Sequence, residues 1–186
     1  MFSLFIGVIV IQRLVELVIA NRNERWMKNN GGIEVGQSHY RYMVTMHTLF
    51  FVSLILEVFL FEKVASPYWP FLLTLFLGTQ LGRIWVIKSL GRYWNTKIII
   101  LPNAKIVKKG PYQFLKHPNY VIVALEFLII PLMFQAYATA VFFTLLNVFI
   151  LSIRIPMEEK ALSELTEYTE VLSGQNRFLP TISKRV

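Results

Sequence analysis

Residues 120–153 read YVIVALEFLIIPLMFQAYATAVFFTLLNVFILSI. This stretch contains two apolar runs, 120–134 and 138–153, with almost nothing between them. A membrane span needs roughly 20 mostly apolar residues to cross a hydrocarbon core about 30 Å thick, and two adjacent runs can both cross it only if the chain turns back on itself. Residues 131–137 are therefore predicted to form the tight turn of a helical hairpin inside a membrane.

Three more apolar runs precede this hairpin, at about 2–20, 42–61 and 68–90. Hydrophobic residues make up 55% of the 186 residues and charged residues 16%, against about 45–50% and about 25% in a typical soluble protein. A chain of one-domain length cannot bury that excess within itself. The sequence predicts an all-α integral membrane protein, a single polytopic domain over 1–186 with about five transmembrane helices. The first run is too polar for a secretory signal, because three residues interrupt it: Gln12, Arg13 and Glu16.

The basic residues test this arrangement, since cytoplasmic loops carry the excess of lysine and arginine. Sixteen of them lie between spans one and two, between spans three and four, or after span five, and only Lys63 lies in the other connections. This alternation predicts an N-terminus outside and a C-terminus in the cytoplasm. The net charge of +8 is then explained by topology and by contact with anionic membrane lipid, so no nucleic-acid partner is predicted. The chain has no cysteine, and no metal site is expected.

Charged residues inside the spans need partners, because isolated charges are costly in lipid. Arg13 and Glu16 are three residues apart on one helix face and can pair with each other. Four further polar residues have no local partner: Glu57, Gln80, Arg83 and Glu126. Two interpretations remain open for them, neutralisation of one another across helices or the lining of a polar site.

Two segments outside the spans are long enough to hold a site. In the first, 91–119, the β-branched run 98–100 and the turn at Pro102 predict a short hairpin with 105–107. The second begins at Arg154, and its leucines then recur at helical spacing. It predicts a separate C-terminal interfacial helix that lies against the membrane face or closes over the first segment.

His117, Glu158 and Glu159 are the candidate chemical groups outside the spans. His117 stands between Lys116 and Pro118 at a membrane boundary, so its backbone is restricted and its ring can bind a polar ligand; a structural role is the alternative. Glu158 and Glu159 either form a solvated helix start or belong to a polar cluster near Arg154. Adjacent residues of a helix point about 100° apart, so only one of the two faces a given ligand.

The order of these residues resembles the isoprenylcysteine carboxyl methyltransferase family. The resemblance lies in GPY at 110–112, KHPNY at 116–120, a hydrophobic hairpin, and then Arg154 with the two glutamates, and it covers roughly 91–180. The segments QRLVEL at 12–17, ANRN at 20–23 and GQSHY at 36–40 are similar to the small bacterial branch of that family. Some members of this branch methylate long-chain alkylpyrones or alkylresorcinols.

The resemblance implies that S-adenosylmethionine binds at the cytoplasmic face, over a cofactor-binding half at 91–180. Carried over position by position, the residues lining the cofactor site would be Tyr112, His117, Pro118, Tyr120 and Glu159. Arg154 would lie near the cofactor or the acceptor oxygen, and Glu158, Glu159 and His117 are the candidate bases for a phenolic acceptor. Two departures from the family pattern are Lys116 in place of the motif arginine, which lacks its bidentate fork, and Val121 in place of a glycine. Both bear more on prenylcysteine as the acceptor than on the cofactor.

These observations predict a membrane O-methyltransferase of a lipophilic small molecule, an alkylpyrone or alkylresorcinol-type polyketide, in the bacterial plasma membrane. Carboxyl methylation of a prenylated cysteine is the first alternative. An NADPH-dependent membrane reductase shares a similar His-Pro-x-Tyr tail, and a non-enzymatic membrane protein would use its buried charges for structure alone. No motif in the chain indicates an oligomeric state.

Overall fold

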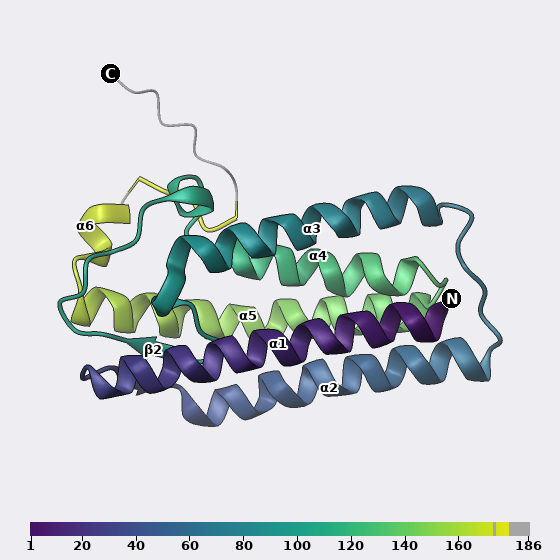
Figure 1. The fold of residues 1–186 in the computed structure, drawn as a ribbon, viewed down its shortest axis with the longest axis horizontal. Helices are drawn as coiled ribbons and strands as arrows, with labels where there is room; N and C mark the ends of the chain where they lie inside the picture. The colour runs from purple at the N-terminus through teal and green to yellow at the C-terminus, as the bar shows by residue number, and fades with distance from the viewer. Residues whose placement is uncertain (173, 179–186) are drawn as a thin grey trace, which may run out of the picture.

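The computed structural model describes residues 1–172 and 174–178 and is built around five long helices. They are α1 (Phe2–Asn29), α2 (Gln37–Leu60), α3 (Trp69–Leu90), α4 (Pro118–Leu132) and α5 (Tyr137–Leu165). Figure 1 shows the five running side by side, with α4 between α3 and α5. The protein is an all-α integral membrane protein, as predicted.

Four of the helices, α1, α2, α3 and α5, are long and apolar enough to cross a membrane. The fifth, α4, is apolar but has only 15 residues, and the predicted span 120–134 is equally short. Helix α1 continues nine residues beyond its predicted end, and the added turns carry Arg22, Arg25 and Lys28 out of the apolar region.

The predicted hairpin of the last two spans is confirmed. The turn between α4 and α5 is buried, with Met133 and Ala136 at 0% exposure, and the backbone N–H of Ala136 donates to Pro131. Glu57 of α2 accepts hydrogen bonds from the backbone N–H and the hydroxyl of Thr139, at 2.8 and 2.7 Å. This carboxylate satisfies free N–H groups in the first turn of α5 and favours its positive dipole end, which explains one of the four unpaired polar residues.

The remaining three residues, Gln80, Arg83 and Glu126, bind one another across helices, together with the charged pair on α1. Glu126 of α4 accepts hydrogen bonds from Arg13 at 2.6 Å, from Gln80 at 2.8 Å and from Arg83. Arg13 also lies 2.6 Å from Glu16. We call Arg13, Glu16, Arg83 and Glu126 the ionic cluster; it balances two cations against two anions and joins α1, α3 and α4.

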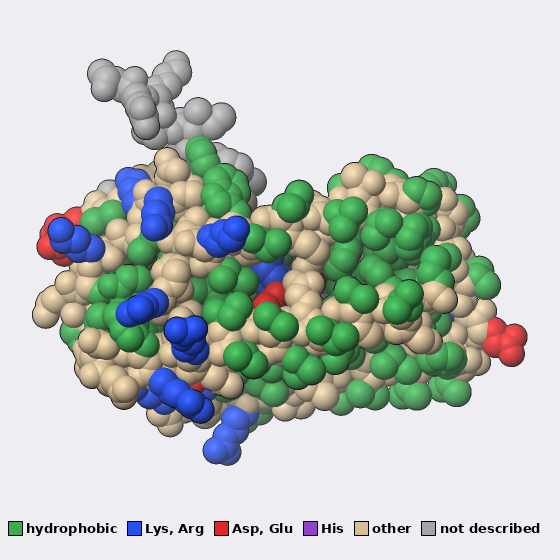
Figure 2. Space-filling view, viewed as in Figure 1, with side chains coloured by type: hydrophobic (Ala, Val, Ile, Leu, Met, Phe, Trp, Pro, Cys, Tyr) green, Lys and Arg blue, Asp and Glu red, His purple; other side chains and the backbone are tan. Residues whose placement is uncertain are grey.

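The surface divides into an apolar part and a basic part. Figure 2 shows lysine and arginine side chains gathered over the half of the molecule that holds β2 and α6, while apolar side chains cover most of the other half. We call the first half the basic end; α1, α3 and α5 finish there and α2 and α4 begin there. Between the helices, an aromatic core of Phe50, Phe127 and Phe143 holds α2, α4 and α5 together.

The predicted strand pairing is wrong. Strand β2 (Ile98–Ile100) pairs antiparallel with β1 (Ile33–Val35), and residues 105–107 form no strand. All three isoleucines of β2 are buried, and the strand contacts both α1 and α5, which places it beside the connection from α1 to α2. Lys97 strengthens this junction, because its hydrogen bond to Glu24, 2.7 Å long, raises the pKa of the lysine above its ordinary value.

The separate tail helix predicted from Arg154 is also wrong, because α5 runs without a break from Tyr137 to Leu165 in spite of Pro156. The chain then becomes extended at Thr166 and forms a short second helix, α6 (Tyr168–Leu172). The predicted closure of the tail over the preceding segment is confirmed. Gln175 donates to the carbonyl oxygens of Tyr112 and Gln113, and Lys108 donates to that of Val171.

Gly110 allows the segment beneath the tail, before α4, to approach α3 closely. Its φ is +59°, and a Cβ there would overlap Ser89 and lie 2.9 Å from Trp85 Nε1. We expect Gly110→Ala to lower the free energy of unfolding by about 1–3 kcal/mol, measured by denaturant titration in detergent. Gly78→Ala is the matched control, since a Cβ at that position would meet no atom within 4 Å beyond its own helix backbone and chain neighbours. Equal stability of the two variants would contradict this interpretation.

Candidate functional site

A cavity of about 490 Å³ runs from the basic end into the helix bundle. At the basic end its walls come from the segment before β2, the start of α4, the end of α5 and α6. Deeper in the bundle, α1, α2, α4 and α5 supply apolar side chains, among them Leu14, Met43, Phe50, Phe127 and Ile150. We call these two parts the polar zone and the apolar zone.

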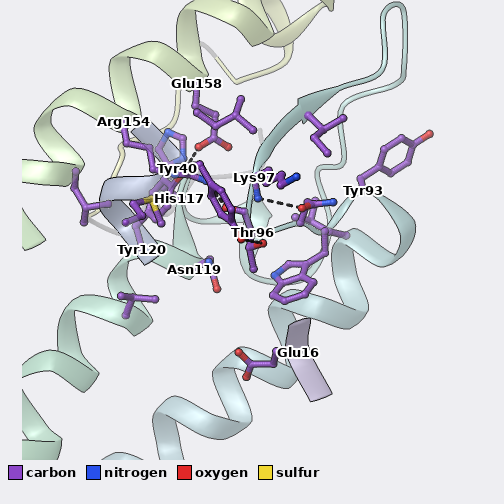
Figure 3. A pocket seen from close by; sticks show the side chains of 18 of the residues that line it. Glu16, Tyr40, Tyr93, Thr96, Lys97, His117, Asn119, Tyr120, Arg154 and Glu158 are labelled. Atoms are coloured by element: carbon purple, nitrogen blue, oxygen red, sulfur yellow. Dashed lines mark hydrogen bonds between the residues drawn. The ribbon is translucent and has the colours of Figure 1, made fainter. Parts of the chain in front are cut away.

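Tyr120 and two residues of α5 form the centre of the polar zone. The Tyr120 hydroxyl donates to Glu158 and accepts from Arg154 Nε at 2.8 Å. Arg154 Nη2 donates to the carbonyl oxygen of Thr96 at 2.7 Å. Figure 3 shows Arg154 and Glu158 facing Tyr120 from the same helix. Arg154 and Glu158 are four residues apart, so they lie on one helix face, and Arg154 is only 4% exposed.

His117 lies at the start of α4, beside this centre. It is the N-cap residue of the helix, and Pro118 follows at the first helical position, where a missing N–H costs nothing. The imidazole stacks on Tyr120 with ring centroids 5.3 Å apart, and its Nε2 lies 3.1 Å from Glu159. Glu159 also accepts hydrogen bonds from Arg177, the shortest 2.5 Å long. Glu159 therefore orients the His117 ring from the side that faces away from the cavity.

The structure thus brings most of the predicted site residues together. Five of them line the cavity: Tyr112, His117, Tyr120, Arg154 and Glu158. The other two, Pro118 and Glu159, are not among its lining residues. As expected for adjacent helical residues, Glu158 faces the cavity and Glu159 does not. Of the predicted cofactor-binding half, residue 173 and residues beyond 178 lie outside the described part of the chain.

Two tyrosines of the polar zone are held in their neutral form. Burial, together with the nearby charge of Glu158, raises the pKa of Tyr112 far above its ordinary value. Burial and the charges of Glu159 and Glu158 likewise raise the pKa of Tyr168. Both hydroxyls can therefore donate a hydrogen bond at neutral pH and cannot serve as anions. Lys116 lies over the Tyr168 ring, with its ammonium 5.7 Å from the ring centroid.

Sequence reasoning missed several polar residues of this zone. Tyr40 of α2 contacts the Thr96 hydroxyl at 3.3 Å, which links α2 to the residue that also binds Arg154 (Figure 3). Asn119 Oδ1, Trp94 Nε1 and the Tyr168 hydroxyl are buried without a hydrogen-bond partner among the described residues, and all three residues line the cavity. The GQSHY segment contained a signal for Tyr40, because it is part of the second resemblance; Thr96 had none.

Two of the polar residues left open by the sequence, Arg83 and Glu126, reach this cavity as well, whereas Glu57 and Gln80 are not among its lining residues. All four members of the ionic cluster line its inner part, and Figure 3 shows Glu16 set apart from the group around Tyr120. The residues of the ionic cluster therefore do what both interpretations predicted: they neutralise one another across helices, and they line a polar patch of the cavity. Within the described chain no group of three or more His, Cys, Asp or Glu side chains could hold a metal ion.

Comparison with known proteins gives two kinds of match. A family described as the isoprenylcysteine carboxyl methyltransferase (ICMT) family matches residues 72–164. The uncharacterized protein YpbQ of Bacillus subtilis (strain 168) is 49% identical over 164 residues, which cover 88% of this chain and 98% of that protein. An uncharacterized protein of Haemophilus influenzae is 28% identical over 154 residues, 82% of this chain and 90% of that protein.

Proposed function

The chain belongs to the isoprenylcysteine carboxyl methyltransferase family, and from this premise we propose that it transfers a methyl group from S-adenosylmethionine to an oxygen of a lipophilic acceptor. The observation that carries the proposal is the single cavity with a polar zone at the basic end and an apolar zone among the helices. The polar zone suits a charged, water-soluble donor. The apolar zone suits an alkyl chain, so the two reactants meet where the zones join.

The donor set of the polar zone fits S-adenosylmethionine. This cofactor carries a sulfonium cation, an amino-acid group, ribose hydroxyls and an adenine. Glu158 offers a carboxylate to the positively charged groups of the cofactor. The unpartnered polar atoms of Asn119, Trp94 and Tyr168 can pair with its amino, carboxylate, hydroxyl and adenine groups. His117, fixed by Glu159, presents a ring beside Tyr120. Buried polar atoms without partners are costly unless a ligand or water satisfies them.

The bound cofactor supplies a methyl group on a positively charged sulfur, from which an acceptor oxygen displaces a neutral thioether in line. Because charge is neutralised in this step, the protein has mainly to position the reactants and exclude water. Arg154 orients the acceptor oxygen beside Tyr120. A carboxylate or acidic enol needs no base, whereas a phenol with a pKa near 10 gives its proton to Glu158. The bond from the acceptor oxygen to the methyl carbon thus forms as the bond from that carbon to sulfur breaks.

The acceptor class that we propose is a long-chain alkylpyrone or alkylresorcinol, bound with its ring at the junction of the zones and its chain in the apolar zone. The basic end faces the cytoplasm, where S-adenosylmethionine is available, in agreement with the distribution of lysine and arginine. A prenylated cysteine would place its prenyl chain in the same zone. Methylation assays with each compound, offered at equal concentration in detergent, distinguish these acceptors.

Binding of S-adenosylhomocysteine tests the cofactor site directly. We expect saturable binding to the detergent-purified protein by isothermal titration calorimetry. His117→Ala and Glu159→Ala should each weaken it about tenfold or more, because one removes the ring and the other its orienting carboxylate. Lys160→Ala, next to Glu159 on α5 but exposed, is the matched control and should bind as the wild type does. Absence of binding to the wild type would refute the cofactor assignment, and NADPH would be titrated next.

A further inference from the structure

Besides Thr48, whose hydroxyl donates to Val44 within α2, two polar side chains line the apolar zone of the cavity and belong neither to the polar zone nor to the ionic cluster. They are His47 of α2 and Asn147 of α5, and both line the cavity. Asn147 is only 1% exposed, and its Nδ2 has no hydrogen-bond partner in the described part of the chain. Phe127 lies against His47, with ring centroids 5.1 Å apart, and the charges of Arg13, Arg83 and Glu126 in the neighbouring ionic cluster also act on the imidazole.

The register of α2 against α5 puts these two residues at the same depth. The hydroxyls of Ser53 and Thr139 lie 2.9 Å apart and fix where the two antiparallel helices meet. Toward the basic end, His47 lies six residues from Ser53 along α2, and Asn147 lies eight residues from Thr139 along α5. At 1.5 Å per residue, their depths differ by about 3 Å.

The same register fixes their distance from the polar zone. His47 is seven residues from Tyr40, and Asn147 is seven residues from Arg154; both Tyr40 and Arg154 bind Thr96. Seven residues are two helical turns, so each pair lies on one helix face with a separation of about 10 Å along the axis. A ligand that reaches from Arg154 into the apolar zone therefore passes His47 and Asn147 about 10 Å from its reacting oxygen.

The hydrogen-bonding roles of the two side chains are complementary. His47 Nδ1 lies 2.8 Å from the carbonyl oxygen of Met43, which is an acceptor only, so Nδ1 carries the proton and Nε2 is left as the acceptor of the ring. Asn147 Nδ2 is a donor. A hydroxyl group satisfies both at once, since it donates to an imidazole nitrogen and accepts from an amide N–H.

We propose that His47 and Asn147 form a second recognition site for the acceptor, which binds a hydroxyl group on its chain about 10 Å from the oxygen that is methylated. This inference rests on the proposed function, and it narrows the acceptor class from a plain alkyl chain to a hydroxylated one. A buried donor that stays unpaired disfavours a ligand without the matching group, so the site discriminates between two chains of equal length.

The test compares two probes, a saturated alkylresorcinol and the same molecule with one hydroxyl on the chain about 10 Å from the ring oxygens. Affinity is measured from ligand-induced thermal shifts of the full-length protein in detergent, with S-adenosylhomocysteine present, so the readout does not need turnover. We expect the wild type to bind the hydroxylated probe about tenfold more tightly, the equivalent of one or two hydrogen bonds. Asn147→Leu and His47→Phe should remove this preference, because the hydroxylated probe loses its partners and the saturated probe no longer leaves a buried polar group unpaired.

Thr144→Val is the matched control, because Thr144 lies one turn from Asn147 on α5, has a buried hydroxyl without a described partner, and does not line the cavity. It should keep the full preference. Asn147→Leu replaces an unpaired buried amide with an apolar side chain of similar size, so the variant is expected to fold. Equal affinity of the wild type for both probes would overturn the proposal. It would mean that a bound water, and not a hydroxyl of the acceptor, satisfies the two side chains. Failure of either probe to be methylated, with the preference intact, would count against the proposed function instead.

Discussion

Replacing Glu126 with leucine is expected to lower the free energy of unfolding by about 3–5 kcal/mol, the cost of leaving buried charges without their partner. Glu126 accepts hydrogen bonds from Arg13, Gln80 and Arg83, and its side chain is only 6% exposed. Without it, two guanidinium groups share the single carboxylate of Glu16 within the helix bundle. The measurement is equilibrium unfolding in mixed detergent micelles, followed by circular dichroism.

The double variant Arg83→Met with Glu126→Leu separates charge balance from packing. It removes one cation and one anion together and keeps the pair between Arg13 and Glu16, 2.6 Å apart. We expect the double variant to be more stable than Glu126→Leu alone, since removal of both partners leaves no uncompensated charge. Glu164→Leu, which disturbs only the exposed contact with Lys160 at 3.9 Å, should change stability by less than about 1 kcal/mol. A loss no larger in Glu126→Leu than in Glu164→Leu would refute the structural role of the cluster.

Arg154→Ala is expected to lower kcat/KM for the lipophilic acceptor by about 100-fold or more, the size of effect seen when a positioned donor is removed from a reacting oxygen. Arg154 is buried and is held in place by Tyr120 and by the carbonyl oxygen of Thr96. Arg154→Lys keeps the charge and cannot make both hydrogen bonds, so it should recover only part of the activity. Initial rates of methyl transfer at several acceptor concentrations give the measurement.

Arg41→Ala provides the comparison, because Arg41 is exposed on α2 and also lies at the basic end. Its kcat/KM should match that of the wild type. The affinity of Arg154→Ala for S-adenosylhomocysteine, measured beside its activity, shows whether the loss concerns the acceptor or the cofactor. Turnover that persists unchanged in Arg154→Ala would exclude the role given to this residue.

The apolar pattern was sufficient to predict the long helices, whereas the site residues were predicted from the resemblance to a family motif. Runs of apolar residues gave all five helices because lipid imposes the same requirement on each span. Tyr120 and Arg154 were assigned to one site by the family resemblance, and the structure shows that a short hairpin joins the helices that carry them. The partner of Ile98–Ile100 could not be predicted, because the strand pairs with Ile33–Val35 on a distant segment whose three residues carry little strand signal.

Two other features depended on tertiary contacts that no local pattern contains. Pro156 and the glutamates suggested a helix start, but α5 continues through them, since packing against β2 stabilises its last turns. Thr96 shows no sequence signal either, because it contributes mainly a backbone carbonyl oxygen to Arg154. His47 and Asn147 lie a hundred residues apart, and only the register of α2 on α5 brings them to one depth.

The short length of α4 has a consequence for the lipid substrate. At the end opposite the basic end, the backbone N–H of Ser66 donates to Met133 at 2.9 Å, so the α4–α5 turn is level with the α2–α3 connection. From that level, 15 residues of helix extend only about 22 Å, less than the hydrocarbon thickness of about 30 Å. We therefore expect His117 and Tyr120 to lie below the water boundary of the bilayer. The proposed lipophilic acceptor would not have to desorb to react, and would avoid the cost of about 0.8 kcal/mol for every methylene group drawn into water. The barrier to methyl transfer then does not grow with the length of the acceptor's chain.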